Sequence, residues 1–364
     1  MHSPEIAERL LDWYHAGRRV LPWRESRNPY HIWVSEIMLQ QTRVEAVKPY
    51  YDRFLKALPT IADLAKAEEE SLLKLWEGLG YYNRVRNLQK AACIIMEQYD
   101  GQMPAEYDAL LKLPGIGSYT AGAVASIAFG IKAPAVDGNV MRVFARIDAD
   151  PEDILLPAHK RRIEAELLEI MPADAPGDLN QALMELGAMV CLPNGAPKCD
   201  TCPLQSLCQA YAKNTMTEYP VKKPKAKRTI EKMTVFLLES ENRLVIRKRP
   251  AKGLLAGMYE FPHQEGFLSK KEAVEYVRSL GIEPVQVKPI AESKHIFTHK
   301  EWHMKGFSVK IDEIRLAEAL ENDRLTAEFL IAKEEIEKKY PIPSAFHAFT
   351  EYLQMQQGSA ALKS

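Results

Sequence analysis

The chain has 364 residues, with 48 lysines and arginines against 49 aspartates and glutamates, so its formal net charge is -1. This length supports two domains with sizeable cores, and a hydrophobic content of 46% is ordinary for a globular protein. A balanced charge excludes binding of polyanions through bulk charge alone, so any basic surface must come from local placement. The N-terminus lacks a signal-peptide pattern and no apolar run approaches a membrane span, so we expect a cytoplasmic protein of bacterial type without membrane association.

Residues 1–212 are predicted to be almost entirely helical. The first helix is amphipathic, with Ile6, Leu10 and Trp13 on one face. Apolar residues then recur at helical spacing, and prolines and glycines mark the joints. The predicted helices cover residues 31–48, 62–77, 84–98, 118–129, 138–147, 158–170 and 178–190.

The segment HIWVSEIMLQQT places an acidic residue, Glu36, inside an apolar helix. Its neighbours on the same face include Ile32, Trp33 and Leu39. A glutamate shielded from water has a raised pKa and can hold a proton near neutral pH. The alternative is an ordinary glutamate on a solvent-exposed face.

The segment LPGIGSYTAGAV predicts a tight turn between two helices. Gly115 and Gly117 carry no side chains, so the backbone N–H groups of the helix beginning at Ser118 can approach an anion closely. This is the helix–hairpin–helix pattern, which holds DNA phosphate without distinguishing sequence. An ordinary helix–helix turn is the alternative.

Downstream, the segment AVDGNVMRVFAR places Asp137 immediately before a helix. We predict that it is the N-cap and that the positive helix end keeps it ionised, with a depressed pKa. Together with a protonated Glu36, it would form the pair of acid and charge stabiliser used in glycoside cleavage. Because perturbed carboxylates are also structural, this pairing is a hypothesis.

Four of the five cysteines lie close together in the run CLPNGAPKCDTCPLQSLC, at Cys191, Cys199, Cys202 and Cys208. Without signs of secretion, disulfides are not expected, and four close thiolates indicate a metal centre. Two closely spaced pairs are typical of tetrahedral zinc, whereas irregular gaps suit an iron–sulfur cluster at least as well.

The remainder of the chain changes in character. Residues 213–230 are rich in lysine and predict an extended linker, either a solvated connector or a basic strap against DNA phosphate. Residues 231–364 predict a separate α+β domain. Its predicted strands are 233–240, 243–250, 285–299 and 301–311, and its predicted helices are 269–281, with Ser269 as N-cap, and 341–354.

In this order, SEIMLQQT, LGYYNRVRNL, LPGIGSYTAGAV, VDGNV and the cysteine run strongly resemble the helix–hairpin–helix DNA glycosylases, and within them the adenine-removing MutY type. The resemblance covers nearly the whole chain. It implies an all-α helix–hairpin–helix glycosylase domain over residues 1–212 with an iron–sulfur loop at 191–208, a linker at 213–230 and an α+β Nudix-like domain at 231–364. It implies a monomeric, nucleoid-associated base excision repair enzyme whose partner is double-stranded DNA containing adenine opposite 8-oxoguanine or guanine.

The resemblance also assigns catalytic roles. Glu36 would protonate adenine at N7, and Asp137 would stabilise the oxocarbenium-like sugar with Asn139 in support. Tyr119 stands where strand-nicking relatives carry a lysine, so base removal without efficient nicking is implied. The alternatives are a bifunctional thymine-glycol-type glycosylase and a catalytically silent DNA-binding protein.

An enzyme that acts on a base within a duplex must extrude that base. By the same resemblance, Gln40, Gln41 and Tyr81 would probe or wedge the base stack, and Trp23, Arg24 and Gln181 would line the adenine pocket. The neighbouring Tyr82 could take the wedging role instead.

The resemblance implies that the four cysteines bind a 4Fe-4S cluster, with zinc as the competing metal. The family spacing is C-x6-C-x2-C-x5-C, whereas here seven residues separate Cys191 from Cys199. Gly195 and Pro197 lie in a loop that could absorb the extra residue.

The segment LLAGMYEFP resembles the Nudix fold, which makes a Nudix hydrolase the rival enzyme. Two acids that would hold magnesium in that family are replaced by Arg278 and Ser279, so the metal site cannot form. A recognition module for 8-oxoguanine is implied instead. Phe297, Thr298 and His299 match the Phe-Ser-His position of the family.

Overall fold

The computed structural model describes residues 4–223, 227–312 and 328–361. The chain forms two compact units, the first from residues 1–67 and 83–224 and the second from residues 68–82 and 225–364. The domain limits expected at residues 212 and 231 stay predictions. Within the described ranges, no helix has the length and apolar character needed to cross a membrane.

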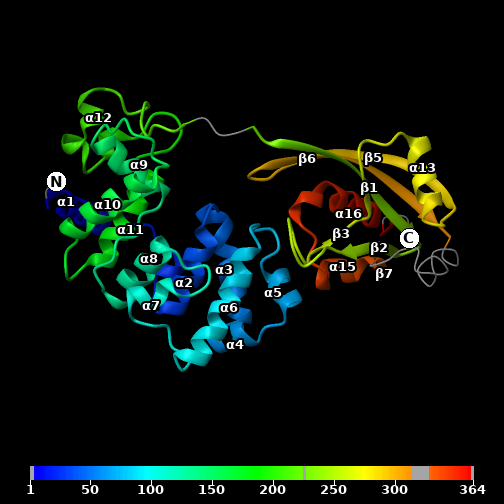
Figure 1. Cartoon of the computed structure of the whole chain (residues 1–364), viewed down its shortest axis with the longest axis horizontal. Coiled ribbons are helices and arrows are strands. Elements are labelled where there is room, and N and C mark those ends of the chain that lie inside the picture. Colours follow the sequence, from blue (N-terminus) through cyan, green and yellow to red (C-terminus); the bar gives the residue numbers. More distant parts are fainter. Residues whose placement is uncertain (1–3, 224–226, 313–327, 362–364) are drawn as a thin grey trace. The chain divides into compact units, whose positions relative to one another are not determined.

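The first unit is built from helices (Figure 1). They are α1 (Glu5–Gly17), α2 (Pro29–Leu39), α3 (Val44–Ala57), α4 (Ile61–Lys66), α6 (Asn83–Gln98), α7 (Tyr107–Leu111), α8 (Ser118–Phe129), α9 (Gly138–Ile147), α10 (Pro157–Ile170), α11 (Pro176–Met189) and α12 (Gln209–Ala212), with a short 3-10 helix η1 (Pro22–Arg24). The predictions for α8 and α9 are confirmed to the residue.

Two predicted helices are each divided in the structure. The one expected over 31–48 is interrupted between α2 and α3, and the one over 62–77 is interrupted between α4 and α5 (Glu69–Leu75). Arg84 donates hydrogen bonds to three carbonyl oxygens at the end of α2. Gln89 does the same for two at the end of α4. These side chains satisfy carbonyl groups that another helical turn would otherwise have to satisfy.

The N-terminal helix α1 packs against α9, α10 and α11, which come much later in the chain (Figure 1). Its buried face, including Leu10 and Tyr14, joins one core with Phe144 of α9 and Leu183 of α11. Helix α8 contacts both α11 and α2, so it links this core to the helices between α2 and α7. Helices α2, α8, α9 and α11 also bound the cavity that contains Glu36 and Asp137.

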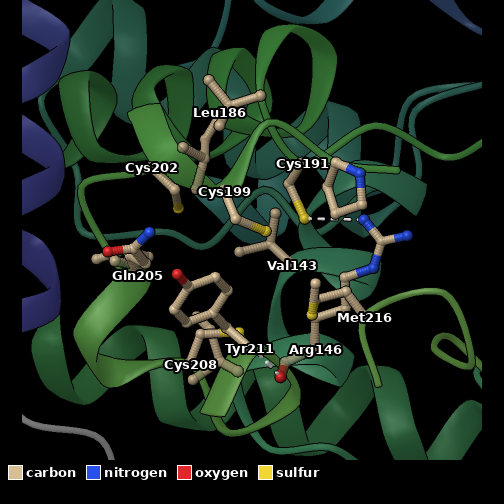
Figure 2. A pocket seen from close by; sticks show the side chains of 14 residues that line it. Val143, Arg146, Leu186, Cys191, Cys199, Cys202, Gln205, Cys208, Tyr211 and Met216 are labelled. Carbon is tan, nitrogen blue, oxygen red and sulfur yellow. Dashed lines mark hydrogen bonds between the residues drawn. The ribbon is translucent and has the colours of Figure 1, made fainter. Parts of the chain in front are cut away.

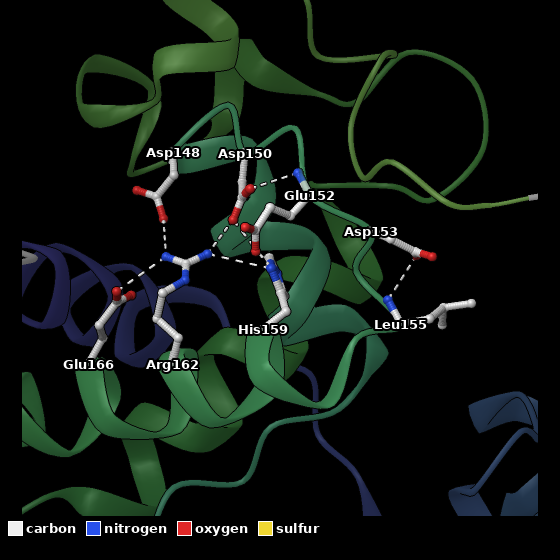
Figure 3. A network of polar contacts seen from close by, with 8 residues as sticks. All are labelled: Asp148, Asp150, Glu152, Asp153, Leu155, His159, Arg162 and Glu166. Atoms are coloured by element: carbon white, nitrogen blue, oxygen red, sulfur yellow. Dashed lines mark hydrogen bonds and ion pairs between the residues drawn. The ribbon is translucent and has the colours of Figure 1, made fainter.

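An ion-pair network fastens α9 to α10. Arg162 pairs with three carboxylates, those of Asp148, Asp150 and Glu166 (Figure 3). Asp150, Glu152 and His159 place potential metal-ligand atoms within 4.8 Å of one another. Because the guanidinium of Arg162 already neutralises Asp150, we interpret this network as a stabilising contact between the two helices and not as a metal site.

The second unit contains a mixed sheet with the strand order β3-β2-β1-β6-β5, to which β4 adds on β1 and β7 on β2. The strands are β1 (Thr229–Ser240), β2 (Arg243–Lys248), β3 (Tyr259–Glu260), β4 (His263–Glu265), β5 (Pro284–Ile296), β6 (Lys300–Ile311) and β7 (Glu328–Ala332). Strands β1 and β6 run parallel, and β5 and β6 form an antiparallel hairpin.

Helices cover both faces of this sheet, α13 (Lys270–Ser279) on one and α15 (Lys333–Lys339) with α16 (His347–Ala361) on the other (Figure 1). Side chains of β1 alternate between the two cores, with Leu237 packing in the core of α16 and Phe236 in that of α13. The predicted N-cap is confirmed, because the Ser269 side chain caps α13, and the structure adds a capping box in which Glu272 accepts a hydrogen bond from the Ser269 N–H group. The strand predicted to reach residue 299 ends at Ile296, and the turn that follows leads into β6.

Candidate active site

One cavity in the first unit is bounded by η1, α2, α8, the start of α9 and α11. Seven of the predicted site residues line it, namely Trp23, Arg24, Glu36, Tyr119, Asp137, Asn139 and Gln181. These residues are distant in the sequence, and the helix packing brings them to one space.

Glu36 lies in the middle of α2, a helix that is buried along most of its length, and only 5% of the residue is exposed. Burial raises the pKa of Glu36 to about 7, while the hydrogen bond from Tyr119 lowers it, Asp137 raises it and Arg24 lowers it. The expectation of a raised pKa is confirmed. At neutral pH this carboxyl can therefore exist in both the protonated and the ionised form.

Tyr119 projects from the first turn of α8 and donates its hydroxyl hydrogen to the carboxylate of Glu36. The same hydroxyl lies 3.5 Å from the sulfur of Met184. Burial raises the pKa of Tyr119 well above its ordinary value, and the charge of Glu36 adds to this. The phenol therefore stays protonated and remains a hydrogen-bond donor to Glu36.

Asp137 is the N-cap of α9, as predicted, and accepts three hydrogen bonds. Two come from the backbone N–H groups of Asn139 and Val140, each at 2.8 Å, and one from the Asn139 side chain at 2.7 Å. The predicted depression of its pKa is wrong, because burial raises the pKa of Asp137 and outweighs these bonds. What distinguishes Asp137 from Glu36 is thus its three N–H donors, which stabilise the ionised form.

Arg142 connects Asp137 to the cysteine loop through Asn139. It is only 7% exposed, and it donates to the Asn139 side-chain oxygen at 2.9 Å. The same guanidinium donates to the carbonyl oxygens of Gly187 and Cys191, both at 2.8 Å. Because one guanidinium bonds both to Asn139 and to the cysteine loop, the orientation of Asn139 depends on the position of that loop.

Glu185 is a cavity residue that sequence reasoning missed. Its carboxylate receives hydrogen bonds from Arg19 at 2.7 Å and from Arg24 at 2.9 Å. Burial alone would raise the pKa of Glu185, but these bonds lower it to about 2. It thereby holds Arg24 in the cavity wall. The sequence did contain an indication of this role, because Glu185 lies in an apolar helix four residues after Gln181 and therefore on the same face.

The predicted phosphate-binding turn has the expected backbone. Gly115 has φ +79°, and a Cβ there would lie 2.7 Å from that of Asn87, so only glycine fits. Gly117 caps α8 without any side-chain hydrogen bond, which leaves the first N–H groups of α8 for an anion. Lys160, a second residue not predicted, donates to the Ser118 hydroxyl at 2.8 Å and adds positive charge beside this helix end.

The predicted probing residues lie at loop positions with unusual backbones. Gln41 has φ +56° and Tyr81 has φ +50°, both uncommon for residues other than glycine. Tyr81 is 50% exposed, whereas Tyr82 is 5% exposed and its hydroxyl bonds to the Gly78 N–H group. Of the two tyrosines, Tyr81 is therefore the accessible one. Gln40 bonds through its side chain to the hydroxyl of Thr120 at 3.3 Å.

The four predicted metal ligands Cys191, Cys199, Cys202 and Cys208 line one apolar pocket (Figure 2). All four are free thiols. Among the described residues, no three of these sulfurs lie within 4.8 Å of one another. A tetrahedral zinc with Zn–S distances near 2.3 Å would bring the sulfurs to about 3.8 Å from one another, so binding zinc would require these thiols to move closer together.

The longer gap between the first two cysteines is absorbed locally. The N–H group of Lys198 bonds to the carbonyl oxygen of Val190 at 2.9 Å, which closes the loop before Cys199. Gly195 supplies the positive φ, +72°, that the loop needs. Arg146 donates to the Cys191 sulfur at 3.2 Å, so this side of the pocket also presents an N–H donor (Figure 2).

Phe297, Thr298 and His299 form the turn between β5 and β6 in the second unit. The Phe297 N–H group bonds to the Lys300 carbonyl oxygen at 2.8 Å, and Thr298 and His299 are exposed. In the same unit, the hydroxyls of Tyr81 and Thr298 are 3.5 Å apart. On α13, the guanidinium of Arg278 pairs with Glu283 at 2.6 Å.

Residues 34–173 match the family described as HhH-GPD superfamily base excision DNA repair protein, and residues 234–352 match the NUDIX domain. An adenine DNA glycosylase of Buchnera aphidicola subsp. Baizongia pistaciae is 35% identical over 314 residues, covering 84% of this chain and 86% of the relative. The adenine DNA glycosylase of Arabidopsis thaliana is 38% identical over 355 residues, covering 82% of this chain. The chain spans little more than half the length of that plant relative, 56%.

Two solved structures resemble more than half of this chain. A thermostable thymine-DNA glycosylase aligns with a TM-score of 0.53 and 32% identity, over 57% of this chain and 95% of its own. A non-covalent endonuclease III–DNA complex aligns with a TM-score of 0.50 and 28% identity, over 59% of this chain and 99% of the other. The relatives, the two family matches and the geometry of the cavity agree, and the chain belongs to the adenine DNA glycosylase family of the HhH-GPD superfamily.

Proposed function

We propose that the protein removes adenine opposite 8-oxoguanine, or opposite guanine, from duplex DNA by acid-assisted hydrolysis of the N-glycosidic bond. The observation that carries this proposal is Glu36, buried with a pKa of about 7 in the same cavity as Asp137. An acid is most effective when its pKa lies near the working pH, because enough of it is protonated and it still gives up the proton. Glu36 would deliver that proton to N7 of adenine, which makes the base a better leaving group.

Asp137 would act on the other fragment. As the bond to adenine breaks, positive charge develops on the sugar, and a fixed anion stabilises that charge. The three N–H donors to Asp137 favour its anionic form. Its position as the N-cap of α9 also keeps its side chain in one orientation.

The proposal includes base removal without efficient strand nicking. Strand cleavage by this superfamily's bifunctional members needs an amine that attacks the sugar carbon. Tyr119 offers a phenol at the matching position, and among the described residues that line the cavity there is no lysine.

DNA contacts follow from the same assignment. The turn at Gly115, Gly117 and Ser118 would hold a backbone phosphate, with Lys160 adding charge. The residues that would contact bases are Gln40, Gln41 and Tyr81 in the stack, Trp23, Arg24 and Gln181 around adenine, and Phe297, Thr298 and His299 at the opposite 8-oxoguanine. A single monomer would supply all of these groups.

Cys191, Cys199, Cys202 and Cys208 would hold a 4Fe-4S cluster in the pocket that they line together, and Arg146 would donate an N–H group to the Cys191 sulfur. When bound, the cluster would fix the loop whose carbonyl group Arg142 contacts. No proton or bond in the reaction is assigned to it.

A single cleavage panel tests the proposal. Duplexes with adenine opposite 8-oxoguanine, guanine, cytosine or thymine are incubated with excess protein, and each sample is divided for treatment with or without alkali. We expect strand breaks that need alkali and that form fastest opposite 8-oxoguanine. Strand breaks without alkali would favour a bifunctional glycosylase, and intact adenine in every duplex would favour a DNA-binding protein without catalysis.

Two variants assign the roles. Glu36→Gln is expected to slow adenine release by about 10²–10⁴-fold, the usual contribution of a general acid. Asp137→Asn is expected to slow it comparably. Binding to a duplex with a non-hydrolysable adenosine analogue serves as the control for folding, and it should change little in both variants.

A further inference from the structure

The residues that lead into β1 hold the turn at Thr298 from both sides. Arg228, immediately before β1, donates through Nε to the carbonyl oxygen of Phe297 at 3.1 Å. The N–H group of Thr229 donates to the carbonyl oxygen of His299 at 3.2 Å. The carbonyl groups that precede and follow Thr298 are therefore both bonded to the end of the basic linker segment.

The same short stretch also reaches the base of the turn. Glu231 accepts a hydrogen bond from the indole of Trp302 at 2.7 Å and pairs with Lys300. The ring of Trp302 packs against that of Phe297, with centroids 4.8 Å apart. Thr298 is thus an exposed side chain on a backbone that is anchored through its neighbours.

The guanidinium of Arg228 is held by a second contact. Its Nη1 lies 3.6 Å from the carboxylate of Glu301, which also pairs with Lys294 at 2.6 Å. The hydrogen bond from Lys294 lowers the pKa of Glu301, so this carboxylate is ionised at neutral pH. A planar guanidinium can face a carboxylate and still donate to a carbonyl group, whereas the single ammonium group of a lysine cannot match both positions.

We propose that Arg228 is a positioning residue for recognition of the base opposite adenine. It acts through the turn at Phe297–His299 and not through DNA phosphate, and it makes the end of the linker part of the recognition site. This inference rests on the proposed function of that turn. A preorganised turn needs no ordering when DNA binds, so fixing Thr298 increases the preference for the matching base.

Three variants separate this role from simple charge. Arg228→Ala removes the contact and the charge, Arg228→Lys keeps the charge, and Lys227→Ala removes the same charge from the exposed neighbouring position. Dissociation constants are measured for duplexes with 8-oxoguanine or guanine opposite a non-hydrolysable adenosine analogue, over a series of salt concentrations. The ratio of the two constants reports recognition, and the salt dependence reports phosphate contacts.

We expect both Arg228 variants to reduce the preference for 8-oxoguanine about fivefold, a modest value because the Arg228 side chain is 45% exposed. Lys227→Ala should leave that preference unchanged, whatever it does to affinity. The opposite result would be an equal loss of affinity for both duplexes in Arg228→Ala, with the salt slope reduced by about 0.9 and with Arg228→Lys behaving as wild type. Arg228 would then be a phosphate contact and the proposal would be wrong.

Amide hydrogen exchange in the free protein tests, without DNA, whether Arg228 holds the turn at Phe297–His299. The Phe297 and Thr229 amides should exchange faster in Arg228→Ala than in wild type or Lys227→Ala. Equal exchange rates in the three proteins would show that Arg228 does not hold the turn. A wild-type protein that shows no preference for 8-oxoguanine would overturn the function of the turn itself. The exchange rates and the wild-type preference therefore separate failure of this inference from failure of the proposed function.

Discussion

Tyr119 of α8 donates its hydroxyl hydrogen to Glu36 of α2, and this one bond opposes the effect of burial on the carboxyl. Burial raises the pKa of Glu36, whereas the hydrogen bond favours the ionised form and lowers it, with a balance at about 7. Tyr119 therefore influences how readily Glu36 gives up a proton.

Replacing Tyr119 with phenylalanine should move the pH dependence of base removal to higher pH. Without the donor, the ionised form of Glu36 loses a stabilising bond and its pKa rises above about 7. Because the protonated form is the active acid, the fall in rate on the alkaline side should begin at higher pH. Single-turnover rates between pH 5.5 and about 9 measure this. Tyr82→Phe is the matched control, and a shift to lower pH in Tyr119→Phe would contradict the assignment.

Replacing Asn139 with alanine should slow base removal through Asp137. The variant loses the 2.7 Å bond to that carboxylate, and a hydrogen bond to a charged group is worth about 1.5–3 kcal/mol. The single-turnover rate should therefore fall by about 10- to 100-fold. The test is a double-mutant cycle with Asp137→Asn, in which the double variant should be no slower than Asp137→Asn alone. Additive losses would mean that Asn139 acts elsewhere.

Replacing Glu185 with glutamine should destabilise the fold, because it leaves Arg19 and Arg24 without their buried anion. We expect a loss of about 3 kcal/mol in the free energy of unfolding at pH 7. The carboxyl has a folded pKa of about 2 against about 4.3 when unfolded, so its contribution is complete above pH ~4.3 and is lost as pH falls towards 2. The difference between variant and wild type should therefore shrink below pH ~4.

Urea unfolding at pH 7 and at pH 3 checks this prediction. Glu45→Gln is the control, because that side chain is 78% exposed and forms a surface ion pair with Lys48, three residues later in α3. It should change stability by less than about 1 kcal/mol. A Glu185→Gln protein as stable as wild type at pH 7 would show that the pair contributes little.

Two glycines should respond in opposite ways to a single methyl group. A Cβ at Gly122 would lie 2.0 Å from the carbonyl oxygen of Pro134, in the segment that leads to Asp137. A Cβ at Gly138 would meet nothing within 4 Å. Gly122→Ala should therefore lose about 3 kcal/mol of stability or more, while Gly138→Ala should gain up to about 1 kcal/mol from helix propensity. Thermal unfolding of both variants tests this prediction. Equal melting temperatures would show that the backbone at Gly122 does not lie as close to the Pro134 carbonyl oxygen as the structure indicates.

Protein purified without oxygen should contain iron and not zinc. If the four cysteines bind the proposed cluster, we expect about four irons per chain and a broad absorption band in the visible-blue region. Cys202→Ser should lose both the iron and part of the stability of the 191–208 loop. One zinc per chain, without the absorption band, would exclude the cluster.

Local features could be predicted from the sequence because neighbouring residues decide them. The bounds of α8 and α9 follow from a glycine turn, an aspartate cap and apolar spacing, all of which lie within a few residues. The N-cap at Ser269 is another example. The cysteine run, the hairpin glycines and the candidate acids were likewise found from short motifs.

Features that depend on distant partners were decided only by the tertiary structure. The helix expected over 31–48 ends early because Arg84, far along the chain, bonds to its carbonyl groups. Glu185 was identified as a cavity residue only from the structure, where it accepts a hydrogen bond from Arg19, 166 positions away. The direction of the Asp137 pKa shift also changed, because the helix end is a local effect whereas burial is produced by the packing of every surrounding helix. The sequence by itself determined which groups are present, and the packing determined their solvation and their partners, on which their chemistry depends.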